Sequence, residues 1–389
     1  MTGSSSKRAT MRGCALLVIV IAPLVSRPAA SQDQFLDYLR SQGSPPADYV
    51  LSKLRTHRVV LLGEHHWIRH DVELVLSLIP RLRDAGVQTL AFEILDAEYQ
   101  DDVDRLVESD KWMPALAMRL QRAQAWPYRE YFEILRAVWE SNRSRAEGET
   151  TLRLLALGPG SDWRERLLPV GETYDSFMAA RILDRARDGG RVLVYAGLNH
   201  VFTRFYQPER PRADRVEAFM DRMGNMLRRK LGEETFTIAL HRPMPCKRQE
   251  SWTQCLPASG VIDCAASTLG SPVGFDIVGS PFAGLPLGPE VLYSLGYPSL
   301  RLVDFTDGYI WFKEIDEYES ASIIPLNEYA PDSTSLEEVA HRNPFSNDEI
   351  DSREQFESLW AREIESRKSF SRRFRWDAIA GWRDLCEQP

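Results

Sequence analysis

The sequence predicts a three-layer α/β fold, in which a mostly parallel central sheet is flanked by helices and followed by a loop-rich C-terminal extension. Between about residues 35 and 241, short apolar runs alternate with longer segments whose apolar residues recur at helical spacing. The short runs have few polar interruptions, as in strands buried on both faces. Because strand and helix alternate, we expect parallel strands joined by helical crossovers.

Five strand-like runs are bounded by Gly, Pro or charged residues. They are RVVLLG (58–63), QTLAFEI (88–94), TLRLLAL (151–157), RVLVYAG (191–197) and TFTIALH (235–241). The helix-like segments between them are HDVELVLSLIPRLRDAG, YREYFEILRAVWES, TYDSFMAARILDRARDGG and DRVEAFMDRMGNMLRRKLG. Three of these four segments end near a glycine that can cap a helix.

The composition changes past residue 243. Gly, Pro and Ser are dense from 257 to 300, and LVDFTDGYIWFKEID (302–316) predicts a hairpin or an edge strand. Two further helices are expected near 351–367 and 374–385. We therefore divide the chain into an α/β domain over 35–313 and a helical C-terminal extension over 314–389.

The first 31 residues have the pattern of a secretory signal peptide. Lys7, Arg8 and Arg12 precede an apolar run, and the small residues Ala29 and Ser31 stand at the positions that a signal peptidase reads. The apolar run is shorter than the roughly 20 residues that span a bilayer. We therefore expect a periplasmic or secreted protein, with no stable membrane span after residues 1–31 are removed.

Charge and composition narrow the classes of ligand. The formal net charge is −8, and no cluster of Lys and Arg stands out to displace the counterions of a polyanion. This balance argues against a nucleic-acid or anionic-membrane partner. A small-molecule or peptide substrate is the expected partner.

Four cysteines remain after the expected signal peptide: Cys246, Cys255, Cys264 and Cys386. An even number in an oxidising compartment predicts disulfides, and four cysteines allow three pairings. Cys246 with Cys264, or Cys255 with Cys264, is expected to staple the loop-rich segment after residue 243. A zinc knot is the weaker alternative, because the close CxxC spacing that chelation favours is absent.

Polar side chains gather at the carboxyl ends of three predicted strands. Glu64, His65 and His66 follow the first strand, Glu93 closes the second, and His200 follows the fourth. The carboxyl ends of parallel strands share one edge of a sheet, where open α/β folds bind their ligands. We therefore expect one site that contains these residues.

The segment GEHHWIRH (63–70) holds three of the seven histidines of the chain. If a helix starts just after Glu64, His66 and His70 are four residues apart and face the same way, within reach of one metal ion, water or substrate oxygen. Glu64 can orient an imidazole or act as a general base. A solvated turn without function is the alternative interpretation.

Glu93 stands in an otherwise apolar strand, where a carboxylate is costly to bury unless it is paired or lies at an open strand end. It is interpreted as a functional acid, with a structural ion pair as the alternative. Weaker candidates are His241, Tyr195, Arg204, Trp126 and Tyr128. His57 precedes the first strand at its opposite end and is excluded.

These residues together resemble the erythromycin esterase/ChaN-like superfamily, which includes haem-binding uptake proteins and Tiki/TraB-related proteins. The resemblance rests on LLGEHHWIRHDVE, LAFEI and VLVYAGLNHV, and more weakly on YDSFMAARIL and FTDGYIWF. It spans about residues 55–313. By this resemblance Glu64, His66, Glu93 and His200 form the polar centre.

Two departures from the family pattern affect the assignment. The esterase branch favours a histidine three residues after the glutamate, where this chain has Trp67. A histidine at the position of His70 resembles the pattern of the ChaN-like branch only. That branch is associated with haem binding at the bacterial envelope. The place of His65 in the pattern is ambiguous.

The first functional hypothesis is a hydrolase of esters, lactones or peptides. Glu64 and His66 would deprotonate a water, Glu93 would orient a histidine or act as an acid, and His200 would stabilise the oxyanion or protonate the leaving group. A divalent metal such as zinc would be held by His66, His70, Glu93 and His200. No GxSxG nucleophile motif is present, which favours direct attack by water.

The second hypothesis is an envelope protein that binds haem or a metal without turnover, with His65 and His70 as further cofactor ligands. A third is a protein without catalysis, whose C-terminal extension contacts a partner. Two glutamates beside three histidines favour the hydrolase, because extra carboxylates add little to haem ligation.

Overall fold

The computed structural model describes residues 32–158, 172–209, 218–248, 251–341, 345, 352–367, 379 and 381–386. The expected signal peptide lies outside these residues, as do residues 374–378 and 380 of the helix expected at 374–385; the described remainder contains the short 3₁₀ helix η12 Trp382–Leu385. No helix in the described part of the chain combines the length and apolarity needed to cross a bilayer.

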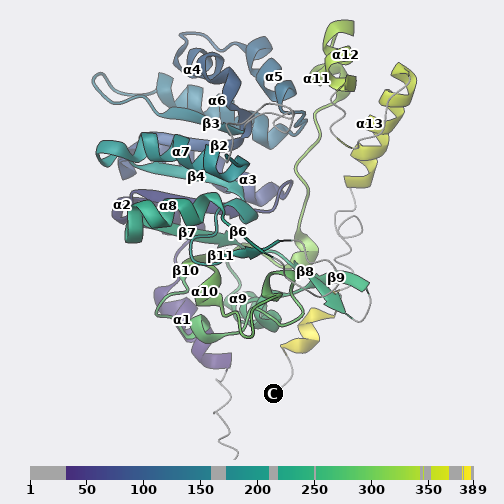
Figure 1. Cartoon of the computed structure of the whole chain (residues 1–389). Coiled ribbons are helices and arrows are strands. Elements are labelled where there is room, and N and C mark those ends of the chain that lie inside the picture. The colour runs from purple at the N-terminus through teal and green to yellow at the C-terminus, as the bar shows by residue number, and fades with distance from the viewer. Residues whose placement is uncertain are drawn as a thin grey trace, which may run out of the picture. The chain divides into compact units, whose positions relative to one another are not determined.

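A seven-stranded sheet forms the centre of the fold, in the order β10-β11-β7-β1-β4-β2-β3 (Figure 1). The five predicted strands are present as β1 Val59–Glu64, β2 Thr89–Asp96, β3 Arg153–Gly158, β4 Val192–Gly197 and β7 Thr235–Leu240. All neighbouring strands in the sheet pair in parallel except β10 Val273–Asp276 and β11 Gly308–Trp311, which are antiparallel to each other. The mostly parallel sheet predicted from the sequence is confirmed.

The prediction for residues 302–316 is wrong in part. This segment forms a short helix, α10 Leu302–Phe305, followed by β11, which lies between β10 and β7 rather than at an edge. The residues after 270 add β10 outside β11, and this strand takes the edge position. β11 is accordingly buried along its whole length, which explains its aromatic and β-branched composition.

Helices cover both faces of the sheet and make the three layers. One face packs against α2 Pro46–Thr56, α3 Arg69–Leu78, α4 Gln100–Glu108, α5 Pro114–Ala123 and α6 Arg129–Arg143. The other packs against α1 Gln32–Gln42, α7 Tyr174–Ala186, α8 Met223–Leu231 and α9 Val261–Leu269. Figure 1 shows α7 and α8 in front of the sheet and α2 and α3 behind it.

Side chains of β1 alternate between the hydrophobic cores on the two faces of the sheet. Val60 and Leu62 belong to the core beside α2 and α3, whereas Val59 and Leu61 belong to the core beside α7 and α8. Successive side chains of a strand point to opposite faces, so a run that is apolar at every position must be covered on both. The apolar run of β1 is uninterrupted in the sequence because both faces of the strand are covered.

The C-terminal part returns to the loops at the carboxyl ends of the strands. It contains α11 Leu326–Tyr329, α12 Ser333–His341 and α13 Arg353–Arg367, the last in agreement with the helix expected at 351–367. The strap, residues 319–324, makes backbone hydrogen bonds to the turn after β1 and to the start of α6: Ala321 N–H donates to Trp67 O at 2.7 Å, and Arg129 N–H donates to Ser322 O at 2.8 Å. Residues 32–389 form one compact unit.

The disulfides are Cys246–Cys255 and Cys264–Cys386, so neither expected pairing is correct. β8 Met244–Arg248 and β9 Ser251–Cys255 form an antiparallel hairpin, which brings Cys246 and Cys255 to a Cα separation of 5.8 Å. Cys264 on α9 instead bonds to Cys386 near the end of the chain. The second bond ties the C-terminal part to the sheet domain.

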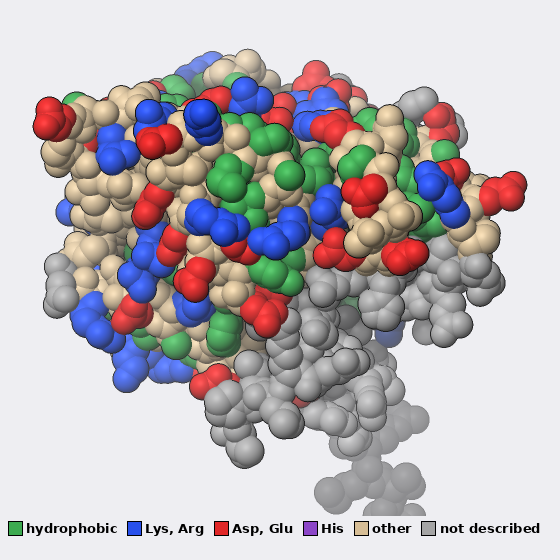
Figure 2. Space-filling model, turned by 90° about the horizontal axis from the view of Figure 1, so that it is seen from above, with side chains coloured by type: hydrophobic (Ala, Val, Ile, Leu, Met, Phe, Trp, Pro, Cys, Tyr) green, Lys and Arg blue, Asp and Glu red, His purple; other side chains and the backbone are tan. Residues whose placement is uncertain are grey.

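Charged side chains of both signs are interspersed on the surface. Figure 2, seen from above relative to Figure 1, shows Lys and Arg alternating with Asp and Glu around small apolar areas. On this face neither sign of charge forms a continuous field.

Candidate active site

Glu64, at the end of β1, is buried and accepts three hydrogen bonds. The hydroxyls of Tyr131 (2.5 Å) and Tyr195 donate to Oε2, and Nδ1 of His66 donates to Oε1 at 2.7 Å. Tyr131 comes from α6 and Tyr195 from β4, so the carboxylate is held from both neighbouring elements. Tyr195 was a weak candidate in the sequence, and Tyr131 was missed because nothing near it along the chain indicates its partner.

His66 lies in the turn between β1 and α3, and not on a helix. Burial lowers the pKa of His66, but the charge of Glu64 and the hydrogen bond to it outweigh burial and raise the pKa to about 9. The imidazole is therefore protonated at neutral pH. A Cβ added to Gly197 would lie 3.0 Å from His66 Nε2 and 3.5 Å from Glu93 Oε2, so both side chains converge on this glycine.

Glu93 occupies the point where the pairing of β2 with β3 becomes irregular, between Phe92 and Asp96. Its Oε2 accepts the N–H of Gly197 at 2.6 Å, and its Oε1 lies 3.5 Å from Nε2 of His200. Burial raises the pKa of Glu93. The positive charges of His200 and His66 lower it by more than burial raises it, so the pKa lies below its usual value. Glu93 is therefore ionised at neutral pH.

His200 ends the short 3₁₀ turn η5 Leu198–His200 that follows β4. Its Nδ1 donates to Oδ1 of Asp175 at 2.8 Å, and Asp175 is itself fixed by the N–H of Met223 at 2.9 Å and by Arg222 at 3.1 Å. Burial lowers the pKa of His200, but Glu93 and Asp175 raise it above its usual value. Asp175 lies in the segment YDSFMAARIL. Its contact with His200 arises only because α7 packs against the η5 turn.

The two imidazoles near Glu93 are supported in the same way. Each holds a carboxylate on Nδ1, Glu64 for His66 and Asp175 for His200. Nε2 of His200 lies 3.5 Å from Glu93, and the charge of Glu93 helps to raise the pKa of His66. The His66 and His200 side chains are 29% and 19% exposed, whereas that of Glu93 is 8% exposed, so solvent reaches the imidazoles more than the carboxylate.

His70 does not join this group, which corrects its assignment as a metal and cofactor ligand. Because residues 65–68 form a turn in which Trp67 adopts φ 77°, α3 begins only at Arg69 and His66 and His70 do not share a helix face. His70 packs between the rings of Phe312 and Tyr318, at centroid distances of 4.6 and 4.4 Å. Burial and the nearby Lys313 lower its pKa well below the usual value.

The proposed metal set of His66, His70, Glu93 and His200 is therefore not brought together. Within the ranges that the structure describes, no three His, Cys, Asp or Glu side chains are placed to hold a metal ion. His65, the other expected cofactor ligand, directs Nδ1 to the guanidinium of Arg242.

An aromatic pair lies beside His66. The rings of Trp67 and Trp126 stack at 5.7 Å, and Trp126 meets the imidazole of His66 edge-on at 5.3 Å. The left-handed backbone of Trp67 is held by its N–H, which donates to the hydroxyl of Tyr131 at 3.0 Å, and by the strap. Of the two aromatic candidates Trp126 and Tyr128, only Trp126 flanks the site. Tyr128 is buried, with 2% of its surface exposed.

The remaining candidates lie apart from Glu93. His241 is fully buried, with Nε2 2.8 Å from Asp263 and Nδ1 2.9 Å from the hydroxyl of Tyr309. Arg204 forms an ion pair at 2.5 Å with Asp307, which precedes β11.

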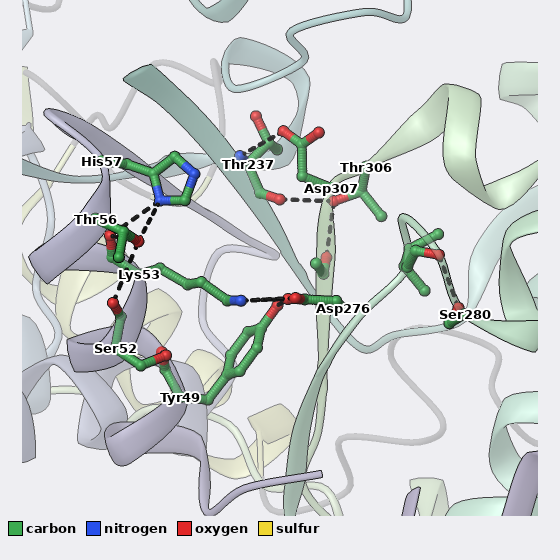
Figure 3. Close-up of polar contacts among 12 residues, drawn as sticks. Tyr49, Ser52, Lys53, Thr56, His57, Thr237, Asp276, Ser280, Thr306 and Asp307 are labelled. Atoms are coloured by element: carbon green, nitrogen blue, oxygen red, sulfur yellow. Dashed lines mark hydrogen bonds and ion pairs between the residues drawn. The ribbon is translucent and has the colours of Figure 1, made fainter. Parts of the chain in front are cut away.

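The opposite edge of the sheet, shown in Figure 3, contains structural contacts. Lys53 and the hydroxyl of Tyr49 both contact the carboxylate of Asp276, at 2.6 and 2.7 Å. His57 belongs to this edge, where its Nδ1 lies 2.9 Å from Oγ1 of Thr56 (Figure 3). Its place at the far end from Glu64, expected from the sequence, is confirmed.

Comparison with known proteins agrees with the resemblance seen in the sequence. Residues 50–167 match the family described as haem-binding uptake, Tiki superfamily, ChaN. This segment, under a third of the chain, contains Glu64, His66 and Glu93 but not His200. The predicted resemblance to this superfamily is confirmed there. No curated protein matches the chain significantly.

Several solved structures are similar to this chain. A succinoglycan biosynthesis protein is 11% identical, with 73% of this chain and 97% of that chain covered and a TM-score of 0.51. An erythromycin esterase variant in its open conformation is 11% identical, covering 68% and 92%, with a TM-score of 0.43. ChaN of Campylobacter jejuni, solved with cofacially bound haem, is 13% identical, covering 49% and 84%, with a TM-score of 0.33. The first of these shows a shared fold.

Proposed function

We propose that this chain, which resembles haem-binding uptake and erythromycin esterase-like proteins, is a hydrolase that activates water at Glu93 and cleaves an ester, a lactone or a peptide. The observation that carries the proposal is an ionised Glu93 that lies 3.5 Å from Nε2 of one carboxylate-supported imidazole, His200, and whose charge acts on a second, His66. A base flanked by two acids is the minimum set for adding water to a carbonyl and expelling its leaving group.

The protonation states of His66 and Glu93 suggest catalytic roles that differ from those expected from the sequence. With a pKa of about 9, His66 holds a proton at neutral pH and cannot remove one from water. Glu93 accepts the proton of the attacking water, while the Nε2–H of His66 stabilises the oxyanion that forms. His200 protonates the leaving group and recovers a proton from Glu93, whose Oε1 is 3.5 Å away.

Glu64 and Asp175 are positioning residues in this scheme. Each accepts the Nδ1 proton of one imidazole, at 2.7 and 2.8 Å, and thereby fixes the orientation of the ring. Their negative charges also keep the imidazoles protonated. The same arrangement orients the histidine of other carboxylate–histidine pairs.

Haem binding is the competing function, because the matched family is named for it. The imidazoles in this site do not fit that role. Both imidazoles have raised pKa values, so binding an iron through Nε2 would require the release of the proton that the proposed reaction keeps there. No step of the proposed reaction uses a metal or haem.

We also propose that the protein is exported to the periplasm or secreted. The pattern of residues 1–31 favours this location, and the disulfides Cys246–Cys255 and Cys264–Cys386 suit an oxidising compartment. The substrate is accordingly expected among small molecules or peptides of the envelope or the medium.

The test is a panel of chromogenic esters, lactones and peptides with the protein produced by export from its full-length gene. Glu93→Gln should lower kcat/KM by about 10² to 10⁴-fold, the range for a general base, because the amide keeps an oxygen for the Gly197 N–H but cannot take a proton. His57→Ala, at the opposite edge, is the matched control. A haemin titration runs in parallel: a Soret shift lost in His66→Ala, with no turnover of any substrate, would replace the hydrolase with a haem carrier.

A further inference from the structure

Arg242, which follows β7, is a buried cation without a carboxylate partner. It is 6% exposed, and it forms no ion pair within the described residues. Nη2 donates to the hydroxyl of Tyr293 at 2.8 Å, and Nη1 contacts Nδ1 of His65. Its Nε is buried without a hydrogen-bond partner. Buried charges are usually paired, because desolvation of an isolated charge is costly.

The neighbouring carboxyl groups are engaged elsewhere. Asp71 accepts the backbone N–H of His65 at 3.3 Å, and burial together with the charge of Glu64 raises its pKa well above the usual value, which favours the neutral form. Asp263 lies 2.8 Å from Nε2 of His241. Neither carboxyl group forms an ion pair with Arg242.

Each carboxylate of the active site already has a basic partner other than Arg242. Glu64 contacts His66, Glu93 contacts His200, and Asp175 contacts His200 and Arg222. None of these three carboxylates therefore serves as the counter-charge of Arg242.

Arg242 also determines which hydrogen-bonding atoms its two neighbours present. A guanidinium only donates, so Nδ1 of His65 must accept and the ring proton is on Nε2. Burial and the charge of Arg242 lower the pKa of His65 well below the usual value, which keeps the ring neutral. His65 thus presents an N–H on its other nitrogen.

The same reasoning extends through Tyr293 to Asn199. The hydroxyl of Tyr293 accepts from Arg242, so its own proton is donated to Oδ1 of Asn199, at 2.9 Å. This orients the amide of the exposed Asn199 with its NH₂ group as the remaining polar function. Asn199 directly precedes His200, as His65 directly precedes His66, so both donors flank the catalytic imidazoles.

We propose that Arg242 and Asn199 form a subsite for an anionic group of the substrate, most simply a carboxylate held beside the scissile bond. This inference rests on the proposed hydrolase function, and it adds a substrate class to it. A carboxylate supplies the counter-charge that Arg242 lacks and accepts the hydrogen bond that the amide of Asn199 offers. A neutral substrate would leave the buried cation uncompensated.

The test compares two p-nitrophenyl esters of equal chain length, the anionic hemiglutarate and the neutral valerate. The wild-type protein should favour the hemiglutarate at least tenfold in kcat/KM. Arg242→Met should lower this ratio at least fivefold, through KM for the anionic ester, and Arg242→Lys should retain part of it. Arg204→Met, which removes a guanidinium paired with Asp307 away from the site, is the control and should keep the wild-type ratio.

Asn199→Asp provides a variant that does not depend on changing a buried residue. The exposed carboxylate keeps an acceptor for Tyr293 but repels a second anion, so the preference for the hemiglutarate should disappear or reverse. Equal kcat/KM values for the two esters in the wild-type protein, or equal losses for both in Arg242→Met and Asn199→Asp, would overturn the subsite.

A binding measurement separates this inference from the proposed function. Calorimetric titration with glutarate should show binding that weakens at least tenfold in Arg242→Met and is unchanged in Arg204→Met. If neither ester is hydrolysed but glutarate binds in this way, the hydrolase fails and the subsite stands. If the esters are hydrolysed but glutarate does not bind, or binds equally to Arg242→Met, the subsite alone fails.

Discussion

The carboxylate of Glu93 lies 3.5 Å from Nε2 of His200, and the N–H of Gly197 donates to its other oxygen at 2.6 Å. Glu93 closes one parallel strand and Gly197 another, so the sheet itself holds the base in place.

The pH dependence of catalysis distinguishes the two roles considered for His66. If His66 acts in its protonated form, kcat/KM should fall as pH rises through about 9, the pKa of this imidazole. If it acts as the base, kcat/KM should instead rise over the same range. The measurement is a pH–rate profile from pH 6 to 11, with His66→Gln as the variant that should lose the transition near pH 9.

Protonation of His66 should also stabilise the folded state at neutral and acidic pH. The pKa of His66 is raised from 6.5 to about 9 in the folded state, so its contribution is fully present below pH 6.5 and is lost as pH rises through 9. A shift from 6.5 to about 9 corresponds to at most about 3.4 kcal/mol. Urea unfolding at pH 6 and at pH 10 should show a loss of stability in the wild-type protein that is smaller in His66→Gln. An equal loss in both would contradict the strong coupling between His66 and Glu64.

Gly197→Ala should damage the site more than the fold. The glycine has φ −56°, which alanine adopts without strain, but its Cβ would lie 3.0 Å from Nε2 of His66 and 3.5 Å from Oε2 of Glu93. Because the imidazole of His66 must shift by a few tenths of an ångström, we expect kcat/KM to fall, by at most the roughly 10²-fold that a misplacement of about 1 Å can cost. Gly284→Ala is the matched control, since its Cβ would meet nothing within 4 Å. Full activity in Gly197→Ala would show that His66 and Glu93 do not act together.

Removal of the long-range disulfide should cost more stability than removal of the hairpin disulfide. Cys264 and Cys386 are 122 residues apart, whereas Cys246 and Cys255 are 9 apart. On the chain-entropy account the larger loop contributes about 2 kcal/mol more. The measurement is urea unfolding of the two double Cys→Ser variants. A larger loss in the hairpin variant would show that local packing around Cys246 outweighs loop closure.

Among the residues of the site, those that the sequence identified lie at strand ends. Glu64, His66, Glu93 and His200 were recognised because parallel strands place their carboxyl ends at one edge, and because a carboxylate is conspicuous in an apolar strand. The structure brings these four together. Their assignment to catalysis stays a prediction.

The residues that hold them in position were not recognisable. Tyr131, Asp175 and Arg242 lie in segments where a tyrosine, an acid at a helix start or an arginine after a strand is ordinary. Their roles arise from contacts between residues far apart along the chain: Tyr131 with Glu64, Asp175 with His200, and Arg242 with His65. Such contacts leave no periodic trace in one sequence.

The sequence by itself determined the parallel sheet, its helical crossovers and the edge at which the polar residues gather, because these follow from the spacing of apolar side chains within each segment. Only the tertiary structure decided that His70 leaves the site, that Cys264 bonds to Cys386, and that β11 lies inside the sheet. Each of these depends on how distant segments pack together, and packing of this kind is selected by the free energy of the whole fold rather than by local propensity.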